Sequence, residues 1–136
     1  MSAADKVLDL LRGTPIRVHD GHVMDSDNVA KTISAPLPYV VFFSTPGAPT
    51  GRRRMSGSAG RGQEFMVNAV GETREQASLT GDIAEAALDG KRIPLGQRQY
   101  LHRADEDAFV RRDDTWTRPD GGPLFTDSRR YAIKTR

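Results

Sequence analysis

Two strand-like runs joined by a long polar segment constrain the fold of this chain more than any other feature. Residues 39–43 (YVVFF) are apolar at every position, which favours a central strand covered on both faces. Residues 64–70 (EFMVNAV) are mostly apolar with high strand propensity, and they are the natural antiparallel partner. The sequence therefore predicts a central hairpin whose two strands are joined by residues 44–63.

The joining segment, residues 44–63, is rich in glycine, serine and arginine and contains no acidic residue. Structureless connections of this length are uncommon in compact domains, and those that occur are mostly functional or disordered. Its small polar residues bury too little surface to offset the cost of ordering, so we expect a mobile arm. We predict that its arginines contact a partner, because the guanidinium fork suits carboxylates and phosphates. These candidate site residues are Arg52, Arg53, Arg54 and Arg61.

A short amphipathic helix and a small hairpin are predicted near the N-terminus. Residues 3–11 place three apolar side chains on one face, and Gly13 follows as a stop signal. Residues 16–19 and 22–24 flank an Asp-Gly pair, which is typical of a tight hairpin turn. The sequence therefore predicts a helix followed by two short antiparallel strands.

The clearest predicted helix follows the second strand of the central hairpin. Thr73 and Gln76 form a capping-box pair at its start, and Gly90 closes it. Leu79 and Ile83 mark an apolar stripe that we expect to face the core. Small residues on the same helix would let it lie close against a sheet. These small residues are Ala77, Gly81, Ala84 and Ala87.

The remaining sequence completes a fold-class prediction. Short strands are predicted at residues 100–102, 108–111, 115–117 and 130–134, with a turn at 119–123. The order of elements predicts one α+β domain over residues 1–136, with a mostly antiparallel sheet and helices packed on one face. The long loop 44–63 extends from the central hairpin of this domain. The predicted core residues are Tyr39, Val41, Phe43, Phe65, Val67, Leu79, Ile83 and Ile133.

The sequence carries no recognisable motif for catalysis, a cofactor or a metal ion. It has no cysteine and no Gly-rich phosphate-binding motif, and the spacing of its three histidines enforces no metal site. Residues 25–36 begin like a calcium loop, but Ala30 and Pro36 stand where glycine and glutamate are required. No apolar run is long enough to span a bilayer. We therefore expect no enzymatic activity, cofactor, metal or membrane partner.

The order of these features resembles that of the tail terminator (tail completion) proteins of long-tailed actinobacterial phages. The N-terminal helix is followed by a PYVVF strand at residues 38–42, the Gly/Arg/Ser loop and a strand ending in Val-Gly. A TREQA helix start at 73–77, an Arg-Asp turn at 112–113 and a terminal RYxI strand at 130–133 complete the pattern. The resemblance covers nearly the whole chain and lies in the order and spacing of these motifs.

This resemblance implies an α+β subunit that forms a closed ring, usually a hexamer, on the end of the phage tail tube. Such a ring ends tube polymerisation and offers a surface to the head–tail connector, and DNA later passes through its lumen. The expected partners are further copies of this chain, the tail tube protein and the connector protein. The expected location is the virion tail or neck, after assembly in the host cytoplasm. The four arginines of the 44–63 arm would face an interface or the lumen.

Two other functions stay open on the sequence. A head-closure or adaptor protein of the phage neck would be built from a similar small α+β domain. A free nucleic-acid-binding protein would use the same four arginines, although the net charge is only +2 and no known binding module is present.

Overall fold

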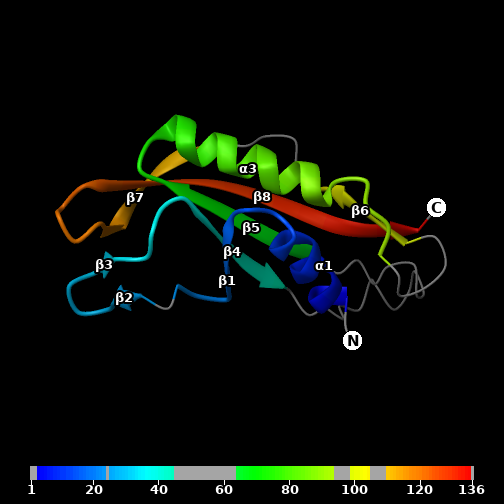
Figure 1. Ribbon diagram of the computed structural model, residues 1–136, viewed down its shortest axis with the longest axis horizontal. Helices are drawn as coiled ribbons and strands as arrows, with labels where there is room; N and C mark the ends of the chain where they lie inside the picture. Colours follow the sequence, from blue (N-terminus) through cyan, green and yellow to red (C-terminus); the bar gives the residue numbers. More distant parts are fainter. Residues whose placement is uncertain (1–2, 24, 45–63, 94–98, 105–109, 136) are drawn as a thin grey trace, which may run out of the picture.

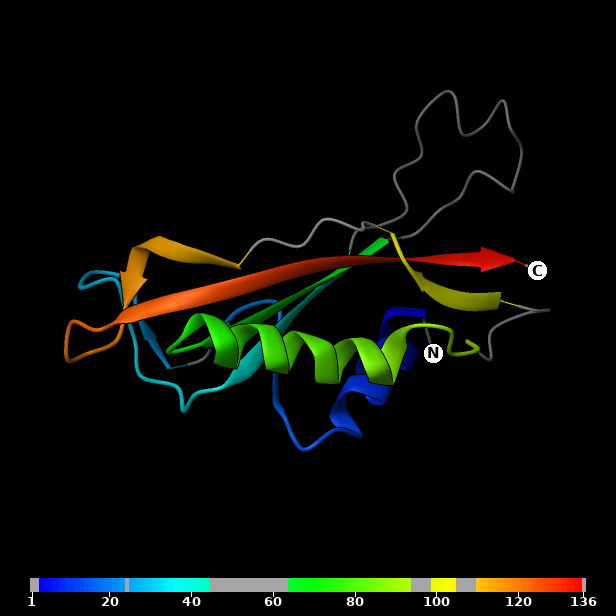
Figure 2. The same cartoon turned by 90° about the horizontal axis from the view of Figure 1, so that it is seen from above.

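The computed structural model describes residues 3–23, 25–44, 64–93, 99–104 and 110–135, which form two helices and an eight-stranded sheet (Figure 1). The helices are α1 (Ala3–Arg12) and α3 (Arg74–Leu88). The strands are β1 (Arg17–Asp20), β2 (Ser26–Asp27), β3 (Thr32–Ile33), β4 (Tyr39–Ser44), β5 (Glu64–Gly71), β6 (Gln99–Arg103), β7 (Val110–Thr117) and β8 (Pro123–Thr135). Both helices lie on the same side of β5 and β8 (Figure 2). The predicted α+β class, with helices packed on one face of the sheet, is confirmed.

The sheet is mixed rather than strictly antiparallel. Its strand order is β1-β4-β5-β8-β7-β3-β2, and β6 pairs with the C-terminal end of β8. Most neighbouring strands are antiparallel, but β1 with β4 and β3 with β7 are parallel pairs. The 13-residue β8 pairs with β5 along one edge and with both β7 and β6 along the other. The turn before β8 has Gly121 at a φ of 85°, as expected for the predicted turn at 119–123.

β4 and β5 form the predicted central pair, antiparallel and in register along the whole of β4. Successive side chains of a strand point to opposite faces. Val40 and Phe42 therefore pack on the helix side, whereas Tyr39 and Val41 pack on the other side. All four are buried, so both faces of β4 are covered where its unbroken apolar run predicts.

The hairpin predicted around Asp20 and Gly21 is wrong. β1 instead pairs in parallel with β4, with Arg17 opposite Tyr39. Gly21 follows with a φ of 87°, and its N–H donates to the carbonyl of Phe42 at 2.9 Å. A two-stranded hairpin is marginally stable in water, whereas the edge of an apolar central strand offers β1 a larger buried surface.

Two predicted short strands belong to longer ones. The strand predicted at 130–134 is the C-terminal part of β8, and the one predicted at 115–117 ends β7. β7 shifts its register against β8 midway along its length. At this irregularity Oδ1 of Asp113 accepts the backbone N–H groups of Thr115 and Trp116, both at 2.8 Å. The polar residues at this irregularity interrupt the apolar pattern, so the sequence does not predict one continuous strand.

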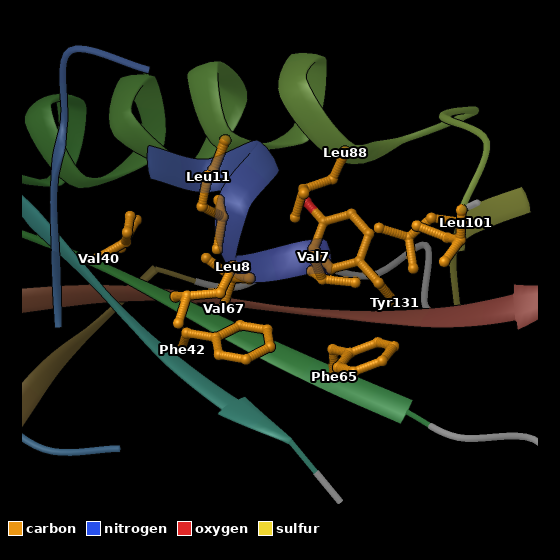
Figure 3. Packing of buried hydrophobic residues seen from close by; sticks show 13 residues of the cluster. Val7, Leu8, Leu11, Val40, Phe42, Phe65, Val67, Leu88, Leu101 and Tyr131 are labelled. Carbon is orange, nitrogen blue, oxygen red and sulfur yellow. The ribbon is translucent and has the colours of Figure 1, made fainter. Parts of the chain in front are cut away.

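The main hydrophobic core lies between the helices and the sheet (Figure 3). Phe42 and Phe65 stack there with their ring centroids 5.7 Å apart. The buried members are Val7, Leu8, Leu11, Val40, Phe42, Phe65, Val67, Ala69, Ala84, Leu88, Ile93, Leu101 and Tyr131. Ile133 is partly buried against them. The predicted apolar face of the first helix is therefore confirmed, as are the core positions on β5.

Three predicted core residues are exposed instead: Leu79 at 62%, Ile83 at 37% and Phe43 at 37%. α3 turns its small residues toward the sheet. The buried residues of α3 are Ala77, Thr80, Gly81, Ala84 and Leu88. A Cβ added to Gly81 would lie 2.9 Å from Oδ2 of Asp127, so this helix and β8 approach too closely for a side chain. The predicted close approach is confirmed, but the predicted burial of Leu79 and Ile83 is wrong.

Candidate functional site

A buried group of charges fixes how α3 lies on the sheet. The side chain of Arg129 on β8 is 6% exposed, and its guanidinium contacts Asp127 at 2.9 Å, Asp82 at 2.9 Å and Glu85 at 3.2 Å. Glu85 also pairs with Arg103 of β6 at 2.8 Å. Burial lowers the pKa of Arg129, but its hydrogen bonds to Asp127 and Asp82 outweigh this effect and raise it. The charged network holds the helix in one orientation, with Leu79 and Ile83 outward and Leu88 in the core.

The outward side of α3 carries an exposed apolar stripe. Leu79, Ile83 and Ala86 recur at the i, i+4, i+7 spacing of one helix face, and all three are exposed. Glu75 and Asp82 are exposed on the same side of the helix. Large exposed apolar groups rimmed by polar residues mark interaction sites. We call Leu79, Ile83 and Ala86 the α3 stripe.

The opposite face of the sheet contains a hollow with a volume of about 310 Å³. A second apolar cluster lies on this face and supplies much of the lining of the hollow. Its buried members are Val23, Ala35, Tyr39, Val41, Val70 and Leu124, with Ile33, Leu37 and Trp116 packed against them. The hollow is lined mainly by apolar and aromatic side chains, among them Tyr39, Val41, Phe43 and Trp116. We call this cavity the sheet hollow.

The polar side chains that line the sheet hollow are His22, Ser26, Asn68, Asp113 and Thr126. Asn68 of β5 lines it, and the Oδ1 atom of this side chain is buried without a hydrogen-bond partner among the described residues. Asp113 also lines it, but Oδ1 of Asp113 already accepts two backbone N–H groups. Because buried polar groups in proteins are usually hydrogen-bonded, Asn68 marks a point where a donor from a partner would be favourable.

His19 of β1 lies on the same face, with its ring edge-on to that of Tyr39 and the ring centroids 5.1 Å apart. Its Nε2 atom is buried without a hydrogen-bond partner in the part of the chain that the structure describes. Burial lowers the pKa of His19; Asp25 opposes this, and Arg17 and His22 lower it further. Burial also raises the pKa of Tyr39 to about 12. Both side chains therefore favour the neutral form at neutral pH.

We expect His19 to make the folded chain less stable in mild acid. Its pKa is lower in the folded state than the ordinary value of 6.5, so the unfolded chain binds the proton first as pH falls. Stability is therefore lost as pH drops from above 6.5 toward the lowered folded pKa. Denaturant unfolding at pH 7.5 and pH 5.5 should show a smaller loss for His19→Gln than for the wild type. Equal losses in the two proteins would contradict this assignment.

The arginines predicted as site residues, Arg52, Arg53, Arg54 and Arg61, lie outside the described residues, so their role stays a prediction. The structure places the two strand ends that flank the arm. Ser44 is the last residue of β4 and Glu64 is the first residue of β5, and these two strands are neighbours in the sheet.

Both described candidate surfaces were missed by reasoning from the sequence. Leu79 and Ile83 were assigned to the core because they mark an apolar stripe at helical spacing. The run of small residues at positions 77, 81 and 84 was the better indicator of the buried face. The sheet hollow has no local sequence signal, because its walls come from six strands and the segment that precedes β2.

No protein-family model matches this sequence, and no curated protein matches it either. Among the residues described by the structure, no three His, Asp or Glu side chains form a group that could hold a metal ion. No helix in the same residues is long and apolar enough to cross a membrane.

Proposed function

We propose that this chain is a ring-forming structural subunit of a phage virion and acts as the tail terminator of a long-tailed phage. In this role the ring caps the tail tube, ends its polymerisation and provides the surface to which the head–tail connector joins. The role requires no catalysis and no cofactor. It combines the order of sequence motifs that resembles tail terminators with an α+β subunit that exposes apolar surface on two sides.

One observation carries this proposal most directly. The α3 stripe, with Leu79 62% exposed, lies on the outer side of the helix layer, and the sheet hollow lies on the other side of the sheet. Two different apolar surfaces on opposite sides of one subunit favour heterologous contacts, which close into rings when the rotation between subunits permits. Such contacts are what a ring-forming tail protein needs.

The proposed partners are further copies of the chain, the tail tube protein and the connector protein. The arm would carry Arg52, Arg53, Arg54 and Arg61 to acidic side chains of the tube or to phosphates of DNA passing through the lumen. Contacts with phosphate would be independent of base sequence, because the phosphate backbone carries no sequence information directly. The proposed location is the tail or neck of the virion, after assembly in the host cytoplasm.

Removal of the coding sequence from the phage genome is expected to give tail tubes of uncontrolled length that do not join heads. A terminator is the component that stops tube growth, so its loss leaves polymerisation without an end point. Electron microscopy of lysates measures tube length directly. Supplying the wild-type chain from a plasmid should restore uniform tails, and an R52E/R53E/R54E variant tests the arm in the same assay.

The same images separate the alternative functions. Tails of normal length that fail to join heads would reject tail termination and favour a head-closure or adaptor protein. Normal, infectious virions in the absence of the chain would reject a structural role in the particle. Full rescue by the charge-reversed variant would remove the arm arginines from the proposal while leaving the capping role in place.

A further inference from the structure

We propose that the α3 stripe of one subunit docks into the sheet hollow of a second copy of the same chain. This inference rests on the proposed ring function and assigns the two surfaces that would build the ring. The occupant is a helix face of stated chemistry: the aliphatic side chains of Leu79 and Ile83, with Ala86 beside them, edged by carboxylates.

The chemistry of the two surfaces matches. The sheet hollow presents the aromatic side chains of Phe43 and Trp116, with the buried Tyr39 also lining it, and the α3 stripe presents exposed aliphatic side chains. The cavity volume, about 310 Å³, lies at the lower limit of small-ligand pockets, which span roughly 300–1,000 Å³. A hollow of this size suits a few side chains better than a large cofactor. Amphipathic helices dock their apolar face in grooves of this kind.

The charges around the two surfaces are also complementary. Glu75 and Asp82 are exposed beside the α3 stripe. Register positions place Arg17, Arg111 and Arg130 on the face of the sheet that contains the hollow, and all three are exposed. The acidic residues near that face include Glu64, Asp113 and Asp25, the last of which acts on His19. The exposed arginines there would attract the acidic edge of a docked α3 and orient it.

The positions of the surfaces dictate the kind of assembly. The sheet separates the hollow from the helix layer, so a subunit cannot place its own α3 stripe in its own hollow (Figure 2). A row of bound subunits has one unused stripe at one end and one unused hollow at the other. Growth then continues until the last stripe reaches the first hollow, which is the head-to-tail closure of a ring.

Cysteine cross-linking tests this pairing without background, because the chain contains no cysteine. The double variant Leu79→Cys/Phe43→Cys places one thiol on the stripe and one at the hollow. Both positions are exposed, so the variant is expected to fold, which circular dichroism checks. Under mild oxidation, a non-reducing gel should show a ladder that extends beyond dimers and ends at the closed ring. Each single variant should give dimers at most.

A matched control replaces the stripe thiol with one on the exposed face of α1, as Asp9→Cys/Phe43→Cys. This pair should give no ladder beyond dimers. A ladder of equal strength in the control, or the absence of a ladder in the Leu79/Phe43 pair, would overturn the proposed docking. The second outcome includes the case in which another segment of the chain fills the hollow.

The outcomes also separate this inference from the proposed function. A ladder from a protein whose loss leaves tail length unchanged would support the interface and reject tail termination. Six-fold rings by native mass spectrometry, with control of tail length but no ladder, would support the function and overturn the interface. The variant Leu79→Asp/Ile83→Asp places two carboxylates on the stripe. It should keep the wild-type unfolding transition and fail to form the ring.

Discussion

Replacing Asp127 with asparagine is expected to destabilise the folded chain by about 3–5 kcal/mol, the cost of leaving a buried charge without its main partner. Asp127 is 1% exposed and bonds the guanidinium of Arg129 through both of its oxygens, at 3.1 and 2.9 Å. The loss of stability should lie toward the lower end of this range, because Asp82 and Glu85 still contact Arg129. Urea unfolding monitored by circular dichroism measures the change.

Asp82→Asn is the matched control for that experiment. Asp82 contacts the same guanidinium at 2.9 Å, but its side chain is 64% exposed, so its loss should cost no more than about 1 kcal/mol. A double variant, Asp127→Leu/Arg129→Met, should recover part of the stability lost in Asp127→Asn, since it removes the unpaired buried charge. Equal effects of Asp127→Asn and Asp82→Asn would show that the network is not buried in solution.

Leu88→Ala is expected to cost about 2–5 kcal/mol, whereas Ile83→Ala on the same helix should change the free energy of unfolding by about 0.5 kcal/mol or less. Leu88 is fully buried against the main core, and Ile83 is 37% exposed on the outer side of α3. Alanine suits a helix in both cases, so the difference measures packing rather than helix propensity. Denaturant unfolding of the two variants provides the test.

The comparison also decides which face of α3 packs on the sheet. A large loss for Ile83→Ala with a small loss for Leu88→Ala would restore the burial predicted from the sequence and would remove the α3 stripe. Gly81→Ala adds an independent check on the same helix. The Cβ of an alanine there would meet Oδ2 of Asp127 at 2.9 Å, so this substitution should destabilise the chain despite its favourable helix propensity.

Local signals in the sequence predicted the elements whose causes are local. The capping pair set the start of α3: Oγ1 of Thr73 accepts the N–H of Gln76 at 3.0 Å, and Oε1 of Gln76 accepts that of Glu72 at 2.7 Å. The apolar run at 39–43 identified a strand buried on both faces, and its antiparallel partner followed at the next run. The helix start depends on residues close in sequence, and an unbroken apolar run of this kind favours a strand covered on both faces.

Features that depend on distant partners could not be read in the same way. β1 pairs with β4 because an apolar edge is available there, and the sequence around Asp20 favours a hairpin just as well. The orientation of α3 depends on Arg129 and Asp127, which lie far along the chain and are ordinary polar residues in the sequence. The sheet hollow depends on how several segments pack together, so no single motif could predict it.

The pairing of β4 with β5 has a consequence for how such a protein can diversify. The two strands are in register up to Ser44 opposite Phe65, and this pairing is made by the described residues of β4 and β5. Loop closure costs only about 0.6 kcal/mol for each doubling of length, so the domain tolerates connecting segments of very different size. The fold and the connecting segment can therefore change independently. One scaffold can carry connecting segments of different length and charge at little cost in stability.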